Sequence, residues 1–169
     1  MQGMDSVVYH GWVDTFLRSL RASLVLAAFL AVTIPGMLLQ YIFLRLRSKR
    51  ANTFPHAYHK LVCRILGVRL HIAGEVARDR PVLLVSNHLS WLDIPVLSAV
   101  APLCFVSKAE VASWPFVSLL AKLQRSVFID RTRKTLVRDK AGEIAERLQQ
   151  GDTIVLFAEG TSSDGNRIL

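Results

Sequence analysis

One stretch of this sequence, residues 22–44, contains no charged side chain. As an α-helix, a run of this length extends about 34 Å, which exceeds the roughly 30 Å hydrocarbon core of a bilayer. Because Pro35 and Gly36 lie near its middle, the run is predicted to form either one kinked membrane helix or a re-entrant helical hairpin. Its length and the lack of a small-residue cleavage site argue against a signal peptide. A buried core helix is the alternative interpretation.

The positive charge of the chain is concentrated directly after this run. Between Arg45 and Arg80 there are nine basic and two acidic residues, which places +7 of the formal net charge of +8 in this window. Anionic lipid and nucleic acid both bind such a patch, but the apolar run before it favours membrane lipid. The basic cluster at residues 45–50 predicts that the following chain lies on the cytoplasmic side. We therefore expect a membrane-anchor region at residues 1–53 and a separate domain at residues 54–169.

Residues 54–70 show the apolar spacing of one helical stripe, with His59, Lys60 and Arg64 off that stripe. This pattern predicts an amphipathic helix. It either lies in the membrane surface with its basic side chains near headgroups, or packs on the core of the domain. Residues 68–73 alternate in hydropathy and are predicted to form a first strand.

Strands and helices are predicted to alternate through the rest of the chain. The apolar runs at residues 82–85, 103–106, 126–129 and 153–157 are typical of strands, and residues 93–100, 111–123 and 136–150 of helices. This order predicts an α/β fold with a mostly parallel central sheet flanked by helices. The unbroken run at 82–85 indicates a strand buried on both faces. Polar groups follow the strand ends, where open α/β sheets bind ligands.

The first of these polar groups is a histidine, His88, followed by Asp93 five residues later. Within one helix this spacing would separate the two side chains by about 140°. They can meet if His88 lies on the turn after a strand and Asp93 begins a helix, a placement that Pro95 in the first helical turn supports. A histidine oriented by a carboxylate can take a proton from a hydroxyl. Ser90 lies between them without an activating partner of its own, which favours direct attack by a substrate hydroxyl.

Two further groups follow later strands. An arginine directly after a strand can bind a phosphate bidentately, although Arg131 can equally be a surface residue or a partner of Asp130. Residues 159–163 after the last strand can offer turn amides and hydroxyls to an anion. The carboxylate of Glu159 needs a substrate hydroxyl or a base as partner. A plain polar loop is the alternative for this segment, which comprises Glu159, Gly160, Thr161, Ser162 and Ser163.

Taken together and in this order, the three groups resemble the motifs of the glycerolipid acyltransferase family, whose bacterial type member acylates 1-acylglycerol-3-phosphate. The motif N-H-x-x-x-x-D is matched by Asn87, His88 and Asp93. The motif F-I-D-R is matched by residues 128–131, and F-x-E-G-T-R-S by residues 157–163 except for its arginine. The resemblance runs from about Gly67 to the end of the chain.

The resemblance implies transfer of a fatty acyl group from acyl-carrier protein or acyl-CoA to the free hydroxyl of a lysophospholipid, at the cytoplasmic side of a bacterial inner membrane. It implies that His88 is the base and Asp93 its partner. The substrate-binding residues that it implies are Asn87, Ser90, Arg131, Glu159, Gly160, Thr161 and Ser162. No metal or cofactor is implied, and Cys63 and Cys104 are too few and too scattered for a zinc site or a disulfide framework.

The sequence departs from the family pattern in two respects. Ser162 stands where the third motif usually has an arginine, which leaves room for a zwitterionic acceptor such as lyso-ornithine lipid, although lysophosphatidate is the acceptor that we favour from the sequence. Members of the family also continue beyond the third motif, so the resemblance implies that the C-terminal part of the family fold is missing from these residues. A non-catalytic membrane-binding fragment is therefore the alternative to an enzyme, and binding of nucleic acid is not expected.

Overall fold

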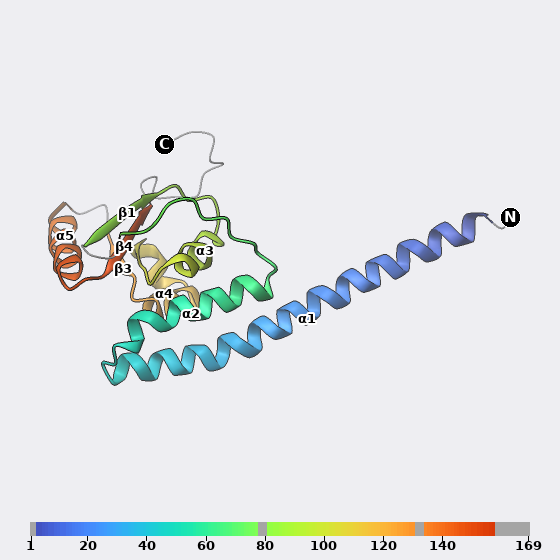
Figure 1. Ribbon diagram of the computed structural model, residues 1–169, viewed down its shortest axis with the longest axis horizontal. Helices are drawn as coiled ribbons and strands as arrows, with labels where there is room; N and C mark the ends of the chain where they lie inside the picture. The colour runs from blue at the N-terminus through green and yellow to red at the C-terminus, as the bar shows by residue number, and fades with distance from the viewer. Residues whose placement is uncertain (1–2, 78–80, 131–133, 158–169) are drawn as a thin grey trace.

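The computed structural model describes residues 3–77, 81–130 and 134–157. A long helix and a second helix precede an alternating series of strands and helices (Figure 1). The elements in chain order are α1 (Gly3–Arg45), α2 (Arg50–Ile65), β1 (Val82–Ser86), α3 (Asp93–Val100), β2 (Cys104–Lys108), the 3₁₀ helix η1 (Ala109–Ser113), α4 (Val117–Leu123), β3 (Val127–Ile129), α5 (Lys134–Gln149) and β4 (Thr153–Phe157).

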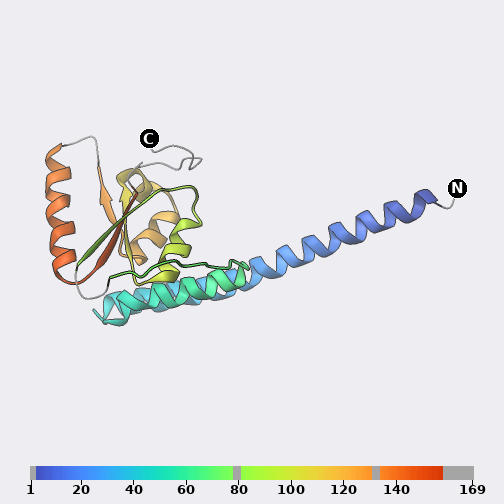
Figure 2. The ribbon, with the colours of Figure 1, turned by 45° about the horizontal axis from the view of Figure 1, so that its top comes forward.

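The four strands form one parallel sheet in the order β1-β4-β2-β3, which confirms the predicted α/β fold. Helix α5 packs on one face of the sheet, where Ile144 and Leu148 cover Ile154 and its neighbours. Helix α3 packs on the other face, where Ile94 and Leu97 contact a core that contains Phe105. Figure 2 shows α5 and the other helices on opposite sides of the strands. The apolar strands are therefore buried mainly at the centre of the sheet.

Strand β1 lies at an edge of this sheet, and the prediction that it is buried on both faces was wrong. Its burial alternates, with Leu83 47% and Val85 65% exposed. Only β4 pairs with it among the described strands, and the side chains of α5 pack against β2 and β4 rather than over β1. An apolar run alone does not distinguish an edge strand from a central strand, because the alternation of apolar and polar residues can be missing from both.

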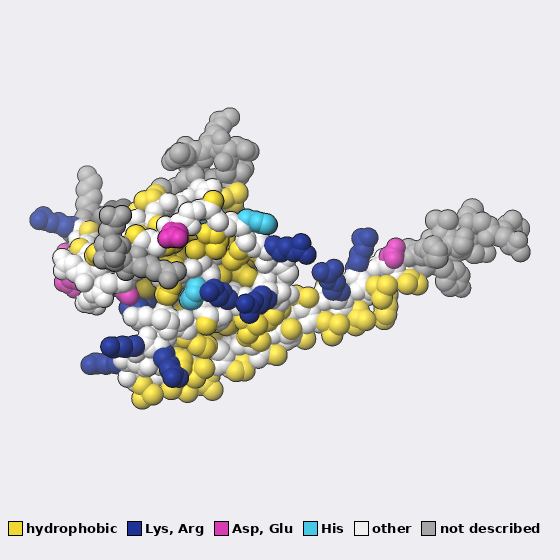
Figure 3. All heavy atoms as spheres, in the orientation of Figure 1, with side chains coloured by type: hydrophobic (Ala, Val, Ile, Leu, Met, Phe, Trp, Pro, Cys, Tyr) yellow, Lys and Arg dark blue, Asp and Glu magenta, His cyan; other side chains and the backbone are white. Residues whose placement is uncertain are grey.

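Helix α1 is one continuous helix through Pro35, so the structure has the helix and not the hairpin. Residues Val13–Arg45 are long and apolar enough to cross a membrane by length and composition, and their most apolar 18-residue window has a mean hydropathy of 2.2. Only 6% of its most apolar window is buried, which excludes a buried core helix. The first part of α1 extends away from the domain, and hydrophobic side chains line most of its described length (Figures 1 and 3).

The second part of α1 packs along α2. The hydroxyls of Thr33 and Tyr58 lie 2.8 Å apart, and the Gln40 amide donates to the Ala51 carbonyl at 2.9 Å. These contacts pair the end of α1 with the start of α2 in opposite directions along the chain, so the two helices form one antiparallel unit.

Helix α2 also packs on the domain, as one of its two predicted placements requires. Its buried residues include Val62 and Cys63. The His56 Nδ1 atom lies 2.7 Å from the Ser98 carbonyl oxygen, which joins α2 to α3. His59, which was expected off the apolar stripe, instead lines a cavity beneath the helix.

Two predicted elements differ in the structure. Residues 68–73 form no strand, because the chain leaves α2 through Gly67 at a φ of 73° and finds no pairing partner in the described sheet. The helix expected at residues 111–123 is divided into η1 and α4. Pro115 lacks a backbone donor, and Phe116 has a φ of 61°, which a continuous helix cannot accommodate.

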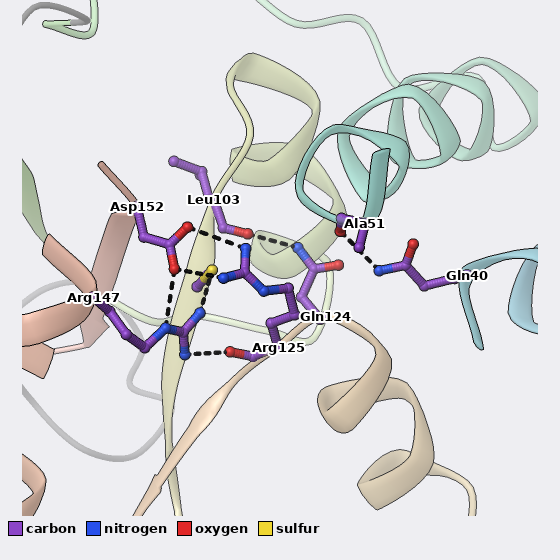
Figure 4. Close-up of polar contacts among 8 residues, drawn as sticks. Gln40, Ala51, Leu103, Gln124, Arg125, Arg147 and Asp152 are labelled. Carbon is purple, nitrogen blue, oxygen red and sulfur yellow. Dashed lines mark hydrogen bonds and ion pairs between the residues drawn. The ribbon is translucent and has the colours of Figure 1, made fainter. Parts of the chain in front are cut away.

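An ion cluster lies at the amino ends of β3 and β4 (Figure 4). The His88 turn lies at the opposite, carboxyl ends of the strands. Asp152 accepts from Arg125 at 3.1 and 2.7 Å and from the Nε atom of Arg147 at 3.0 Å. Arg147 also donates to the Arg125 carbonyl at 2.7 Å. The Asp152 side chain is only 9% exposed, so the carboxylate neutralises two partly buried guanidinium groups.

Asp152→Ala is expected to lower the free energy of unfolding by about 3 kcal/mol, because it leaves two partly buried arginines without a counter-charge. Denaturant unfolding of the detergent-solubilised protein, followed by circular dichroism, measures this change. Glu143→Ala is the matched control, since it removes the half-exposed ion pair with Lys140 and should cost less than about 1 kcal/mol. Equal losses in the two variants would contradict the assigned role of the cluster.

Candidate active site

His88 and Asp93 meet at the junction of β1 and α3, as their spacing predicts. The chain leaves β1 at Ser86 and turns so that Asp93, the first residue of α3, faces back toward the histidine. The His88 Nδ1 atom lies 2.9 Å from Asp93 Oδ2. The same oxygen accepts from the backbone N–H groups of Leu89 at 2.8 Å and Ser90 at 2.9 Å. Asp93 therefore fixes both the imidazole and the turn that carries it.

The imidazole ring of His88 stacks on the ring of Phe157 from the neighbouring strand. The two ring centroids lie 4.2 Å apart, with 24° between the planes. Ser86 and Phe157 are partners in the parallel register of β1 and β4, so the sheet itself places this aromatic ring beneath the histidine. With its Nδ1–H donated to the carboxylate, the ring carries its lone pair on Nε2, where a base is needed. Sequence reasoning did not single out Phe157 as a support for the histidine.

The other predicted site residues fall into two groups. The Ser90 hydroxyl accepts from the Leu92 N–H at 3.2 Å and so shapes the turn, while the side chain of Asn87 is exposed beside it. The remaining residues lie outside the described part of the chain, namely Arg131, Glu159, Gly160, Thr161 and Ser162. Of the strands that precede them, β4 is the direct neighbour of β1, whereas β3 lies at the opposite edge of the sheet. Of the three predicted groups, the described residues thus contain the turn with His88, Ser90 and Asp93, and these residues lie close together.

A cavity of about 730 Å³ extends from His88 between the helices. This volume is in the range of small-molecule sites. Its walls are mainly apolar and come from α1, α2, α3, η1, α4 and the ends of β2 and β4, and they include Phe29, Gly36, Met37, Phe54, Tyr58, Val62, Trp91, Ile94, Phe105, Trp114, Leu120 and Phe157. This cavity was not predictable from the sequence, because its walls are assembled from distant segments.

Two basic side chains also line this apolar cavity. Lys108 is the last residue of β2 and is exposed at the carboxyl ends of the strands, where the His88 turn also lies. A cation directly after a buried apolar strand is the signal that could have identified it. His59 lies in the wall formed by α2, and burial lowers its pKa from 6.5 to about 4, an effect that the Pro55 carbonyl partly offsets and the nearby His56 reinforces. His59 is therefore neutral in the folded protein at neutral pH.

The lowered pKa of His59 predicts a loss of stability in acid. The unfolded chain binds a proton at this residue below about pH 6.5, whereas the folded chain does so only near pH 4. Stability should therefore fall as the pH decreases through this window, by about 3 kcal/mol from this group. Denaturant unfolding at a series of pH values measures the effect, and His59→Gln should flatten the curve between pH 6.5 and 4. An unchanged pH dependence in that variant would contradict the assignment.

Across residues 3–77, 81–130 and 134–157, no cluster of three His, Cys, Asp or Glu side chains could hold a metal ion. The two cysteines are buried and free. Their thiols have raised pKa values because of burial, so both remain protonated at neutral pH.

A parallel sheet with a histidine–carboxylate pair at a strand end, an apolar cavity beside it and a membrane-length helix before it defines a membrane-associated α/β protein. Its site has the groups of a transferase or hydrolase. The sequence model of the acyltransferase family matches residues 67–169, and the chain belongs to that family. The family resemblance inferred from the three motifs is thereby confirmed.

Individual relatives and a solved structure agree with this assignment. The chain is 45% identical over 153 residues to the lyso-ornithine lipid O-acyltransferase of Brucella abortus, covering 90% of this chain and 57% of that protein. It is 36% identical over 105 residues to the 1-acyl-sn-glycerol-3-phosphate acyltransferase of Neisseria gonorrhoeae, covering 59% and 41%. The crystal structure of the 1-acyl-sn-glycerophosphate acyltransferase of Thermotoga maritima matches with a TM-score of 0.64 and 24% identity, covering 90% of this chain and 66% of that one, which shows the shared fold.

The matches to these relatives cover a larger share of this chain than of the relatives themselves. The chain spans about half the length of the curated relatives that it matches, with 57% of the Brucella abortus protein and 47% of the 46% identical lyso-ornithine lipid O-acyltransferase of Rhizobium meliloti covered. The activity and substrates of those full-length proteins therefore enter only as a proposal for this chain.

Proposed function

We propose that this protein transfers a fatty acyl group from a thioester donor, acyl-carrier protein or acyl-CoA, to the free hydroxyl of a lysolipid. The His88 Nε2 atom takes the hydroxyl proton as the oxygen attacks the thioester carbonyl carbon. The carbon–sulfur bond then breaks, and the leaving thiolate receives the proton from the imidazolium. Asp93 holds the reactive tautomer and stabilises the imidazolium charge. The observation that carries this proposal is the 2.9 Å contact between His88 and Asp93, with His88 in the wall of an apolar cavity.

The surroundings of the pair support a lipid substrate. The cavity can hold an acyl chain away from water while the reacting thioester of the donor lies near His88. Residues 1–53 anchor the chain through α1, and residues 54–169 carry the chemistry. The basic cluster at residues 45–50 supports a cytoplasmic position for the site, at the surface of the bacterial inner membrane and its anionic lipids.

Within this proposal, several residues bind the acceptor. Arg131 and the segment 159–162 follow β3 and β4 in the sequence and supply a cation, turn amides and hydroxyls for a polar headgroup. Lys108 adds positive charge at the carboxyl end of β2, where an anionic group of either substrate would be stabilised. Asn87 and Ser90 border the reacting hydroxyl from the turn of His88.

Two acceptors have specific support. A lyso-ornithine lipid is favoured by Ser162, which replaces an arginine, and by the two relatives of that name with 45% and 46% identity. Lysophosphatidate is favoured by the arginine of the F-I-D-R sequence and by the Neisseria gonorrhoeae relative. The similarity to the named relatives is greater for the first, and we therefore place lyso-ornithine lipid ahead of lysophosphatidate.

An acceptor panel tests this proposal. Membranes containing the protein would be incubated with labelled acyl-carrier protein or acyl-CoA and, separately, with lyso-ornithine lipid, lysophosphatidate and lysophosphatidylethanolamine. The proposal expects labelled diacyl product from at least one acceptor, with lyso-ornithine lipid giving the highest rate. A higher rate with lysophosphatidate reverses the order of acceptors. Absence of product with every acceptor favours a membrane-binding fragment instead.

Gly36 tests whether the cavity holds the acyl chain. A Cβ atom at this position would lie 3.4 Å from the Tyr58 ring, so a leucine side chain must extend into the cavity or push that ring aside. Gly36→Leu is expected to reduce the rate with a long-chain donor about tenfold relative to a short-chain donor. Donor chain-length profiles measure this shift. Gly142→Leu on α5, where an added Cβ meets nothing within 4 Å, is the control and should leave the profile unchanged.

A further inference from the structure

The chain between Glu110 and Lys122 is an exposed segment without any charge, although it lies outside the long apolar helix. Its large hydrophobic side chains are open to the surroundings, with Trp114 55% and Phe116 54% exposed, and Val117 and Leu119 exposed beside them. Contiguous apolar patches of this kind on a folded domain mark a surface that binds a partner or a membrane. We call the residues Trp114–Val117 the aromatic turn.

Backbone contacts and a buried serine define the conformation of the aromatic turn. The Ser118 N–H donates to the Trp114 carbonyl at 2.9 Å, and Ser118 itself is buried. Phe116 has a φ of 61°, in a region that bulky residues rarely adopt. A backbone outlier of this type persists only where the surrounding structure fixes it, and such positions cluster at functional sites. The fold thus presents two aromatic rings at a defined place on its surface.

The aromatic turn lines the cavity together with the membrane-length helix. Trp114, Phe116 and Val117 line the cavity together with Phe29 and Met37 of α1. The Gln40 amide of α1 donates to the Leu123 carbonyl at 2.9 Å, which joins the end of α4 directly to α1. The exposed apolar side chains of α1 and those of the aromatic turn therefore flank the same cavity.

We propose that the aromatic turn inserts into the interfacial layer of the same leaflet that α1 enters, so that the cavity opens sideways toward the lipids. Tryptophan rings favour the headgroup level of a bilayer, because the apolar ring can leave the water there while its N–H still donates a hydrogen bond. Lys108, on the cavity wall, and Lys122, at the end of α4, carry positive charge near the turn and would face anionic headgroups. A lipid chain could then pass from the leaflet into the cavity without crossing water.

Fluorescence quenching by lipids tests the insertion without requiring turnover. The full chain with Trp12→Phe and Trp91→Phe retains Trp114 as its one tryptophan. It would be reconstituted in vesicles of phosphatidylcholine and phosphatidylglycerol whose acyl chains are brominated either near the headgroup or near the terminal methyl. We expect strong quenching of Trp114, greater with the shallow bromines than with the deep ones.

The control places the probe on the opposite face of the sheet. Glu146 is exposed on α5, and Glu146→Trp in a chain with Trp12, Trp91 and Trp114 all changed to Phe reports a surface that faces water. Quenching of Trp114 no greater than in this control overturns the proposal and would assign the turn to a protein partner. If the probe variant fails to fold, Trp114→Phe in the otherwise natural chain should lower the total quenching, and no decrease would overturn the proposal equally. Because quenching is independent of catalysis, a failure of the proposed function would not affect the result.

Discussion

His88→Ala should lower the rate of acyl transfer to a lysolipid by about 10³-fold or more, while leaving the protein folded and bound to membranes. General-base catalysis by a positioned histidine contributes roughly 10² to 10⁴ to a rate. Among the described residues, Asp93 is the titratable side chain that forms a hydrogen bond with His88, and its carboxylate contacts the ring rather than the cavity. The rate is measured as labelled diacyl lipid formed from a labelled thioester donor.

The control for this variant is another histidine. His71 is exposed, in the segment between α2 and β1, and His71→Ala should retain the activity of the natural protein. Circular dichroism and membrane flotation of both variants separate a lost base from a lost fold. Activity of His88→Ala within tenfold of the natural protein would exclude His88 as the general base.

Asp93→Asn should lower the rate of acyl transfer by about 10² to 10⁴-fold with little change in the shape of the turn. The amide oxygen can still accept from the N–H groups of Leu89 and Ser90, which lie 2.8 and 2.9 Å from the present Oδ2 atom. The same amide oxygen can also accept from the Nδ1–H of His88, but it carries no negative charge to stabilise the imidazolium that forms when the ring takes the hydroxyl proton. Proton transfer to the ring is therefore less favourable although the contact geometry is kept.

Kinetics of the purified variant distinguish this effect from a loss of binding. The account expects a lower kcat with a nearly unchanged KM for the acceptor, because the carboxylate acts through the histidine rather than on the substrate. Asp139→Asn, at an exposed position on α5, is the matched control and should behave as the natural protein. An increase in KM at constant kcat would instead place Asp93 in the binding of the acceptor.

The sequence was sufficient for the features that depend on local pattern. The strands at the centre of the sheet are short apolar runs separated by helical spacing, and a parallel sheet follows from that alternation. The contact of His88 with Asp93 was predictable because both residues belong to one strand-to-helix junction, where only four residues separate them and few geometries are possible. Pro95, which lies in the first turn of α3, fixed the place at which that helix begins.

Features that depend on distant segments were not predictable. The exposure of Val85 follows from the position of β1 at the sheet edge, which only the strand order determines. The neutral state of His59 and the cavity that it lines require α1, α2 and α4 to be packed together. The division of the expected helix at Phe116 reflects a backbone conformation that no propensity indicates, since aromatic residues seldom adopt a positive φ.

The most direct test of the central claim is the fate of the acyl group in a single incubation. Membranes containing the natural protein would be mixed with a labelled acyl thioester and lyso-ornithine lipid or lysophosphatidate, then separated into lipid and protein fractions. The account predicts label in the diacyl lipid, none attached covalently to the protein, and only background label in the lipid with His88→Ala. Absence of labelled diacyl lipid from the natural protein, or equal labelling with His88→Ala, would contradict it.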